Sequence, residues 1–165
     1  MNATENSVAY AQLYLDWFMV NDLSRWEVQN DSHIKFYFQD KSSVTNYEDF
    51  LLYHEQAFIN IEEFFNFSMD QRIFFFVWDN TYDPLAILGK SYPFALPRLY
   101  IVNTSYYHTY GHEIAHVIMY HALKTKISHM LLNEGIAVYL DQSNRNRIET
   151  ERIALNGKIL NLSEL

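Results

Sequence analysis

The sequence contains no cysteine, which excludes a disulfide framework, cysteine-ligated zinc and a cysteine nucleophile. Glycine occurs 4 times and proline 3 times, and no internal repeat is present, so the chain is neither collagen-like nor of low complexity. No apolar run approaches the roughly 18 residues that a membrane-spanning helix needs. We therefore expect no membrane span.

Positive charge is also scarce. Lys and Arg number 12 against 20 Asp and Glu, a net charge of −8 with no basic cluster, so we expect no nucleic-acid partner. The opening M-N-A-T-E-N-S has no basic residue before Arg25, unlike a secretory signal peptide. A mature chain whose leader had been removed would begin in the same way, so an extracytoplasmic location agrees with the sequence but no compartment is assigned.

Aromatic and aliphatic residues are abundant. Hydrophobic residues make up 49% of the 165 positions, including 13 Tyr and 12 Phe, which is too many for a disordered chain. This length is enough to bury a substantial core. We predict one domain over residues 1–165.

The N-terminal half alternates between helix and strand patterns. Apolar residues recur near one face of residues 7–20, which predicts a helix, and alternation over His33–Gln39 predicts a half-buried strand. Thr45 and Glu48 have the spacing of a capping box, and a long apolar stripe at three- and four-residue steps follows them. His54 lies in that stripe, and we interpret it as a core histidine.

Strand patterns continue toward the middle of the chain. The apolar run Arg72–Trp78 predicts a central strand, and Arg98–Asn103 predicts another. Proline is tolerated in a sheet chiefly at an edge. Because Pro93 and Pro97 accompany Tyr92–Leu96, we predict an edge strand there.

Helices are expected to dominate the C-terminal part, over 107–124, 129–142 and 145–157. The order of the patterns predicts an α+β fold. It would consist of a small mixed sheet with a backing helix, followed by further helices.

The helix predicted over 107–124 contains the motif H-E-I-A-H. On a helix, residues four apart lie on one face, so His112 and His116 present two imidazoles to one point. This spacing suits a single tetrahedral metal ion. Glu113 lies about 100° further round, which is too far for a ligand but beside an open coordination position.

A third ligand is available in the next helix. Glu134 follows a turn-length linker, and we expect Gly135 beside it to let the two helices approach closely. Two imidazoles and a carboxylate, with one open position, form an established catalytic zinc set. The sequence therefore predicts one zinc ion held by His112, His116 and Glu134. The helix packing would use Leu131, Ile136, Ala137 and Leu140.

H-E-I-A-H followed by L-N-E-G-I-A-V-Y resembles the gluzincin zinc peptidases, the clan containing thermolysin and the alanyl aminopeptidases. In pattern it is most similar to the bacterial peptidase MA-like domains. The resemblance implies a zincin-like fold over most of the chain, with a zincin active-site helix and a second, glutamate-bearing helix. It also implies His112, His116 and Glu134 as zinc ligands, Glu113 as general base, and a peptide or protein substrate.

One departure from the family concerns the substrate amine. Members that cleave free N-termini carry a Gly-x-Met-Glu-Asn strand whose glutamate holds the amine, whereas this chain reads G-K-S-Y-P-F-A-L-P with no carboxylate. We therefore favour an endopeptidase over an aminopeptidase. Tyr92, Phe94 and Ala95 are predicted to bind an extended substrate by strand addition.

A second departure concerns the donor to the oxyanion, which gluzincins supply from well beyond the ligand glutamate. This chain ends at Leu165, so we expect a fragment or a minimal form with weak or no activity. We expect the residues before the motif helix to line the mouth of the cleft, and Tyr139 to pack between the helices. The candidates inside the chain are Tyr106, Tyr107, His108, Tyr110 and Tyr139, of which Tyr110 and Tyr139 are carried forward.

Two alternatives to an active peptidase remain: a zinc-binding domain kept for interaction without hydrolysis, and a latent form that needs a further segment. A purely structural zinc site would be closed by a fourth protein ligand. His108, His121 and His129 are near enough in sequence to close it. We interpret each of them as a surface or hydrogen-bonding histidine.

Overall fold

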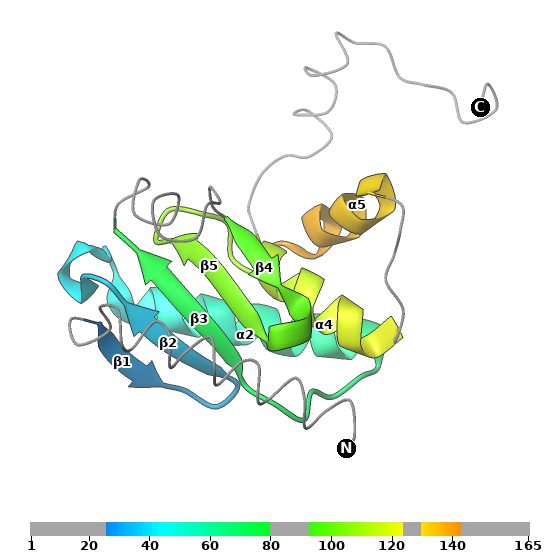
Figure 1. Ribbon diagram of the computed structural model, residues 1–165, viewed down its shortest axis with the longest axis horizontal. Helices are drawn as coiled ribbons and strands as arrows, with labels where there is room; N and C mark the ends of the chain where they lie inside the picture. The colour runs from blue at the N-terminus through cyan, green and yellow to red at the C-terminus, as the bar shows by residue number, and fades with distance from the viewer. Residues whose placement is uncertain (1–25, 80–92, 124–129, 143–165) are drawn as a thin grey trace, which may run out of the picture.

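The computed structural model of the protein describes residues 26–79, 93–123 and 130–142 (Figure 1). The strands are β1 (Glu27–Asn30), β2 (Ile34–Phe38), β3 (Ile73–Trp78), β4 (Phe94–Leu96) and β5 (Ile101–Ser105). The helices are α2 (Tyr47–Phe65), α4 (His112–Leu123) and α5 (Met130–Leu140), with short 3-10 helices η2 (Lys41–Ser43) and η3 (Pro97–Leu99). The helices expected over 7–20 and 145–157 lie outside the described residues.

The five strands form one mixed sheet in the order β1-β2-β3-β5-β4, which confirms the α+β fold. β3 lies at the centre and pairs in parallel with β2 and β5, while β1 and β4 are antiparallel edge strands. The aromatic run of β3 is buried on both faces: Phe75 and Val77 join the larger core, and Phe76 and Trp78 join a second cluster on the opposite face. The predictions of a central strand here and of an edge strand before Pro97 are confirmed.

Helix α2 backs the sheet on the face that also carries α4 (Figure 1). Helix α2 begins at Tyr47, one residue later than the predicted capping box requires. Asn46 precedes it in the left-handed region, at φ 54°, and makes no side-chain cap hydrogen bond, so Thr45 is not the cap. Asparagine tolerates this conformation better than most residues, and it turns the chain into the helix.

His54 is a core histidine, as predicted. Its side chain is 2% exposed, and Nδ1 donates to the Phe50 carbonyl at 2.8 Å. The rings of Phe36, Phe75 and Tyr110 surround it. Burial lowers the pKa of His54 to about 4, with partial compensation by the hydrogen bond to Phe50. The ring is therefore neutral in the folded protein.

The segment between β4 and β5 differs from the prediction. Pro97–Leu99 form η3 rather than the start of a strand, and Tyr100 adopts φ 57° before β5 begins. Proline at the first position of η3 favours a helical turn over strand pairing, because it has no N–H to give to a ladder. The strand predicted over Arg98–Asn103 is thus shifted to Ile101–Ser105.

Helix α4 starts at His112, the first histidine of the motif, and not at Tyr107. Gly111 precedes it with φ +94°, and a Cβ at this position would lie 3.0 Å from the Ala57 Cβ of α2. Only glycine combines this backbone angle with such a close approach. The start of the motif helix is therefore set by a glycine turn against α2. No helix within the described ranges is both long enough and apolar enough to cross a membrane.

Candidate metal centre

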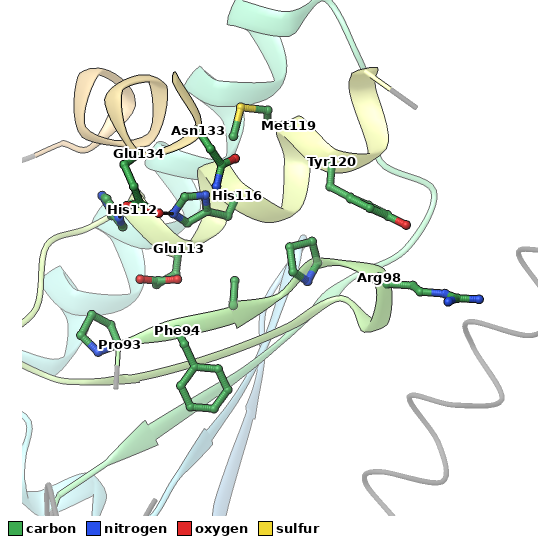
Figure 2. Close-up of a pocket in the computed structure, with 12 residues that line it drawn as sticks. Pro93, Phe94, Arg98, His112, Glu113, His116, Met119, Tyr120, Asn133 and Glu134 are labelled. Carbon is green, nitrogen blue, oxygen red and sulfur yellow. Dashed lines mark ion pairs between the residues drawn. The ribbon is translucent and has the colours of Figure 1, made fainter. Parts of the chain in front are cut away.

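The structure brings the three predicted metal ligands together. His112 and His116 project from the first turns of α4, and Glu134 reaches them from α5 (Figure 2). His112 Nε2 lies 3.3 Å from Glu134 Oε2, and His116 Nε2 lies 3.5 Å from Glu134 Oε1. The three ligand atoms lie within 4.8 Å of one another.

These separations fit a small divalent metal ion. Metal–ligand bonds of about 2.0–2.2 Å in a tetrahedron place neighbouring donor atoms roughly 3.3–3.6 Å apart. The two His–Glu distances, 3.3 and 3.5 Å, are of that size and run to the two different oxygens of the Glu134 carboxylate. One carboxylate and two imidazoles so arranged could hold a metal ion without large rearrangement.

The packing of α5 against α4 positions Glu134. Ala137 and Leu140 are buried in the larger core, and Ile136 packs against it at its edge, as predicted. The side chain of Leu131 lies outside the description. The prediction for Gly135 is wrong, because this residue is exposed and a Cβ there would meet nothing within 4 Å. The helices approach each other through Ala137 on another face.

The end of α5 is also tied to the residues that precede α4. The backbone N–H of Gln142 donates to the Tyr110 carbonyl at 2.8 Å, and Asn60 Nδ2 of α2 donates to Gln142 Oε1 at 3.3 Å. The two ligand-bearing helices are therefore linked through α2 as well as directly.

Asn133 is a site residue whose role the sequence did not reveal. Its side chain hydrogen-bonds to His116 and lines the pocket. Burial lowers the pKa of His116, while the Glu134 carboxylate and the Asn133 hydrogen bond act in the opposite direction. A hydrogen bond to the ring nitrogen that does not bind the metal orients a ligating histidine. Its position directly before Glu134 was the available signal.

Glu113 lies in the pocket beside the triad but is not part of it (Figure 2). Its side chain is 8% exposed. Burial, and secondly the charge of Glu134, raise the pKa of Glu113 to about 8. A cation bound at the triad would act against this shift, since it favours the ionised carboxylate.

The pocket has a volume of about 690 Å³ and lies between β4 and the two ligand-bearing helices. From the sheet side it is lined by Pro93, Phe94, Ala95, Pro97 and Arg98, from α4 by His112, Glu113, His116, Met119 and Tyr120, and from α5 by Asn133 and Glu134.

The predicted substrate-binding residues are partly in place. Phe94 and Ala95 line the pocket, whereas Tyr92 lies outside the described residues. The Phe94 ring points away from Glu113, on the far side of β4 (Figure 2). Phe94 therefore offers its backbone rather than its ring to the pocket.

The candidate oxyanion donors do not line the pocket. The Tyr110 ring packs against His54 and Tyr53, at centroid distances of 5.0 and 5.2 Å. Tyr139 is 66% exposed, and its ring lies 6.0 Å from Phe64 of α2, so it does not pack between α4 and α5 as expected. The expectation that the mouth is lined from before the motif helix is also wrong for the pocket described, since none of its lining residues is Tyr106, Tyr107 or His108.

Tyr120 is instead the tyrosine that reaches the pocket. It lies one turn after His116 on the same face of α4, which is the signal that could have found it. Its side chain points away from the triad (Figure 2).

Two of the three histidines considered as a fourth ligand are engaged elsewhere. His121 Nε2 donates to the Pro97 carbonyl at 2.9 Å, and His108 Nδ1 lies 2.5 Å from Ser105 Oγ. His129 lies outside the described residues. Within the described part of the chain, the group that could hold a metal ion contains three residues, His112, His116 and Glu134.

Comparisons of the chain with protein-family models, with curated proteins and with solved structures found no match.

Proposed function

We propose that this protein is a zinc-dependent peptide hydrolase of the gluzincin type. The observation that carries the proposal is a three-ligand group with His–Glu separations of 3.3 and 3.5 Å, beside a buried carboxyl group that is not a ligand. When bound, zinc would supply Lewis-acid chemistry, polarising a carbonyl and acidifying water. A purely structural site has no use for an additional carboxyl group in an adjoining pocket.

Glu113 is the general base in this proposal. Its carboxylate takes a proton from the attacking water and passes it to the leaving amine. Burial of the side chain keeps bulk water from competing for that proton, and the neighbouring ligands hold the reacting groups close. Asn133 holds the His116 ring in place.

The edge strand β4 would bind the substrate. Among the described strands β4 pairs with β5 alone, and an extended peptide would add on the side away from β5. The carboxylates among the described lining residues are Glu113 and Glu134, both engaged at the metal centre. Since no further carboxylate is placed there to hold a substrate amine, endopeptidase activity is favoured over aminopeptidase activity.

A latent or non-hydrolytic zinc domain is the second candidate, and one observation favours it. Among the described lining residues, the only hydroxyl belongs to Tyr120, which points away from the triad. Loss of one oxyanion donor typically lowers the rate by about 10²–10³. Weak hydrolysis by this 165-residue chain would therefore agree with the proposed chemistry.

The test is a broad peptide-library digest by zinc-loaded wild type and Glu113→Gln, with bound zinc measured in both. We expect cleavage by wild type alone and equal zinc in both proteins, because the amide matches the carboxylate in shape but cannot accept the proton. His116→Ala should lose the metal. If Glu113→Gln loses as much zinc as His116→Ala, Glu113 is a ligand and the assigned roles are wrong.

A further inference from the structure

The pocket continues well beyond the metal centre. Its carboxylates and imidazoles gather at the triad, whereas its far end is lined by Tyr120 of α4 and by Pro97 and Arg98 of η3. Tyr120 and Arg98 lie at the same end in Figure 2 and point away from the triad. A water molecule takes about 30 Å³, so a metal ion with one bound water would fill only a small part of the 690 Å³. Most of the pocket is therefore available for substrate residues.

The wall of the pocket formed by η3 is held in place by contacts within the protein, without a ligand. The Pro97 carbonyl accepts hydrogen bonds from His121 Nε2 at 2.9 Å and from the Tyr100 backbone N–H at 3.1 Å. The Tyr100 ring stacks on His121, with centroids 4.2 Å apart. These contacts hold Pro97 and Arg98 against α4 before any ligand arrives, which lowers the entropic cost of binding.

This end of the pocket carries a positive charge at Arg98, while the Asp70 carboxylate lies close enough to act on Tyr100 and His121. Among the described residues that line the pocket, Arg98 is the only lysine or arginine, although acidic residues outnumber basic ones by 20 to 12. A guanidinium group forms paired hydrogen bonds with a carboxylate. Arg98 is exposed, so its side chain can turn toward a bound peptide.

The hydrogen bond from His121 to Pro97 sets the polarity of the cleft. It places η3 beside the C-terminal half of α4, so β4, which leads into η3, runs in the same direction as α4. Antiparallel strand pairs are commoner and slightly more stable than parallel ones. A peptide that adds to β4 in this way has its N-terminal end at η3.

The rise per residue of a helix and of an extended peptide then shows which peptide residue meets the far end of the pocket. Tyr120 lies six residues after the midpoint of His112 and His116, which is about 9 Å along the helix. An extended peptide advances about 3.3 Å per residue. The far end of the pocket therefore meets the second or third residue before the scissile bond.

We propose that Arg98 selects an acidic side chain, aspartate or glutamate, two or three residues before the scissile bond. The aliphatic part of that side chain packs against Pro97, and its carboxylate pairs with Arg98. This inference rests on the proposed function, because it assumes that a peptide lies on β4 with its reacting carbonyl at the metal centre.

Peptide hydroxamates test the proposal without requiring turnover. A C-terminal hydroxamate chelates zinc, so the residues before it must occupy the side that precedes the scissile bond. Short peptides with Glu, Gln or Lys at the second or third position from the hydroxamate are titrated into the zinc-loaded protein by calorimetry. We expect Glu to bind about fivefold more tightly than Gln, and Lys more weakly than both.

Two charge reversals make the test specific. Arg98→Glu should invert the preference, whereas Arg72→Glu changes the net charge equally but lies before β3, outside the pocket, and should leave it unchanged. A matching series with the varied residue on the other side of the chelating group should show no Glu preference. A preference confined to that series would overturn the proposed polarity.

The remaining outcomes separate this inference from the proposed function. If hydroxamates bind with no charge preference, or if Arg98→Glu leaves the preference intact, the inference fails while the metal centre stands. If no hydroxamate binds to the zinc-loaded protein, the proposed function fails and this inference fails with it.

Discussion

The residues at the candidate metal centre depend on one another for their stability in the fold. His112, His116 and Glu134 could supply the ligand atoms for a metal ion, Asn133 hydrogen-bonds to one of the imidazoles, and Glu113 occupies the adjoining pocket. Each member costs stability when buried alone, and a bound cation offsets much of that cost. The group is best understood as one unit.

Asn133→Ala should lower zinc affinity by about 10- to 100-fold, because the variant frees the His116 ring. Asn133→Asp retains an acceptor and should recover most of the loss. Leu132→Ala is the matched control, since Leu132 is 58% exposed on a neighbouring position of α5. Competition titration with a zinc indicator measures all three. An unaltered affinity in Asn133→Ala would show that the hydrogen bond has no effect on the metal.

His54 should make the fold sensitive to acid. Its pKa is about 4 in the folded state against an ordinary value of 6.5, so its contribution to stability is present above pH 6.5 and is lost as the pH falls through about 4. A shift of this size corresponds to at most about 3 kcal/mol. His54→Phe should remove this part of the pH dependence of the free energy of unfolding, measured by urea denaturation between pH 4 and pH 7. Identical slopes in both proteins would contradict the assignment.

At the scale of elements, the two described glycines have different backbone conformations and surroundings. Gly111→Ala should destabilise the protein by about 1–3 kcal/mol, because φ is +94° and the new Cβ would lie 3.0 Å from Ala57 Cβ. Gly135→Ala is the matched control, being helical and exposed, with nothing within 4 Å of its Cβ. It should stabilise by up to about 1 kcal/mol. Thermal unfolding distinguishes the two, and the same sign for both would refute this account.

Elements with strong periodicity could be predicted from the sequence, and their boundaries could not. The aromatic run of β3 and the apolar stripe of α2 identify a buried strand and a helix directly. β1 was missed because E-V-Q-N has neither clear alternation nor an apolar run, and it forms only by pairing with β2. The starts of α2, β5 and α4 follow positive φ angles at Asn46, Tyr100 and Gly111, and at Gly111 a close approach to Ala57 accompanies the angle.

In the candidate site, too, some features could be predicted from the sequence and others could not. The triad was predictable because helical spacing fixes two ligands and the next helix offers one carboxylate. The tyrosines were not predictable, since Tyr110 and Tyr139 differ from Tyr120 only in the neighbours that the fold gives them. Chemical type alone could not rank these tyrosines.

At the scale of the whole molecule, metal binding should couple to folding. The candidate ligands come from α4 and α5, so a bound ion would link α5 to the rest of the core. A ligand present at 100 times its dissociation constant stabilises the folded state by about 2.7 kcal/mol. Chelation should therefore lower the melting temperature of wild type by several degrees and leave that of His116→Ala unchanged. An equal response of the two proteins would indicate that the metal acts elsewhere.

The most direct test of the central claim is an X-ray absorption spectrum at the zinc edge, recorded on the protein loaded with one equivalent of zinc. The account predicts two imidazoles and oxygen donors at about 2.0–2.2 Å. It also predicts an unchanged ligand set in Glu113→Gln and the loss of a carboxylate donor in Glu134→Ala. Three or more imidazoles around the ion, or a spectrum that changes in Glu113→Gln and not in Glu134→Ala, would contradict it.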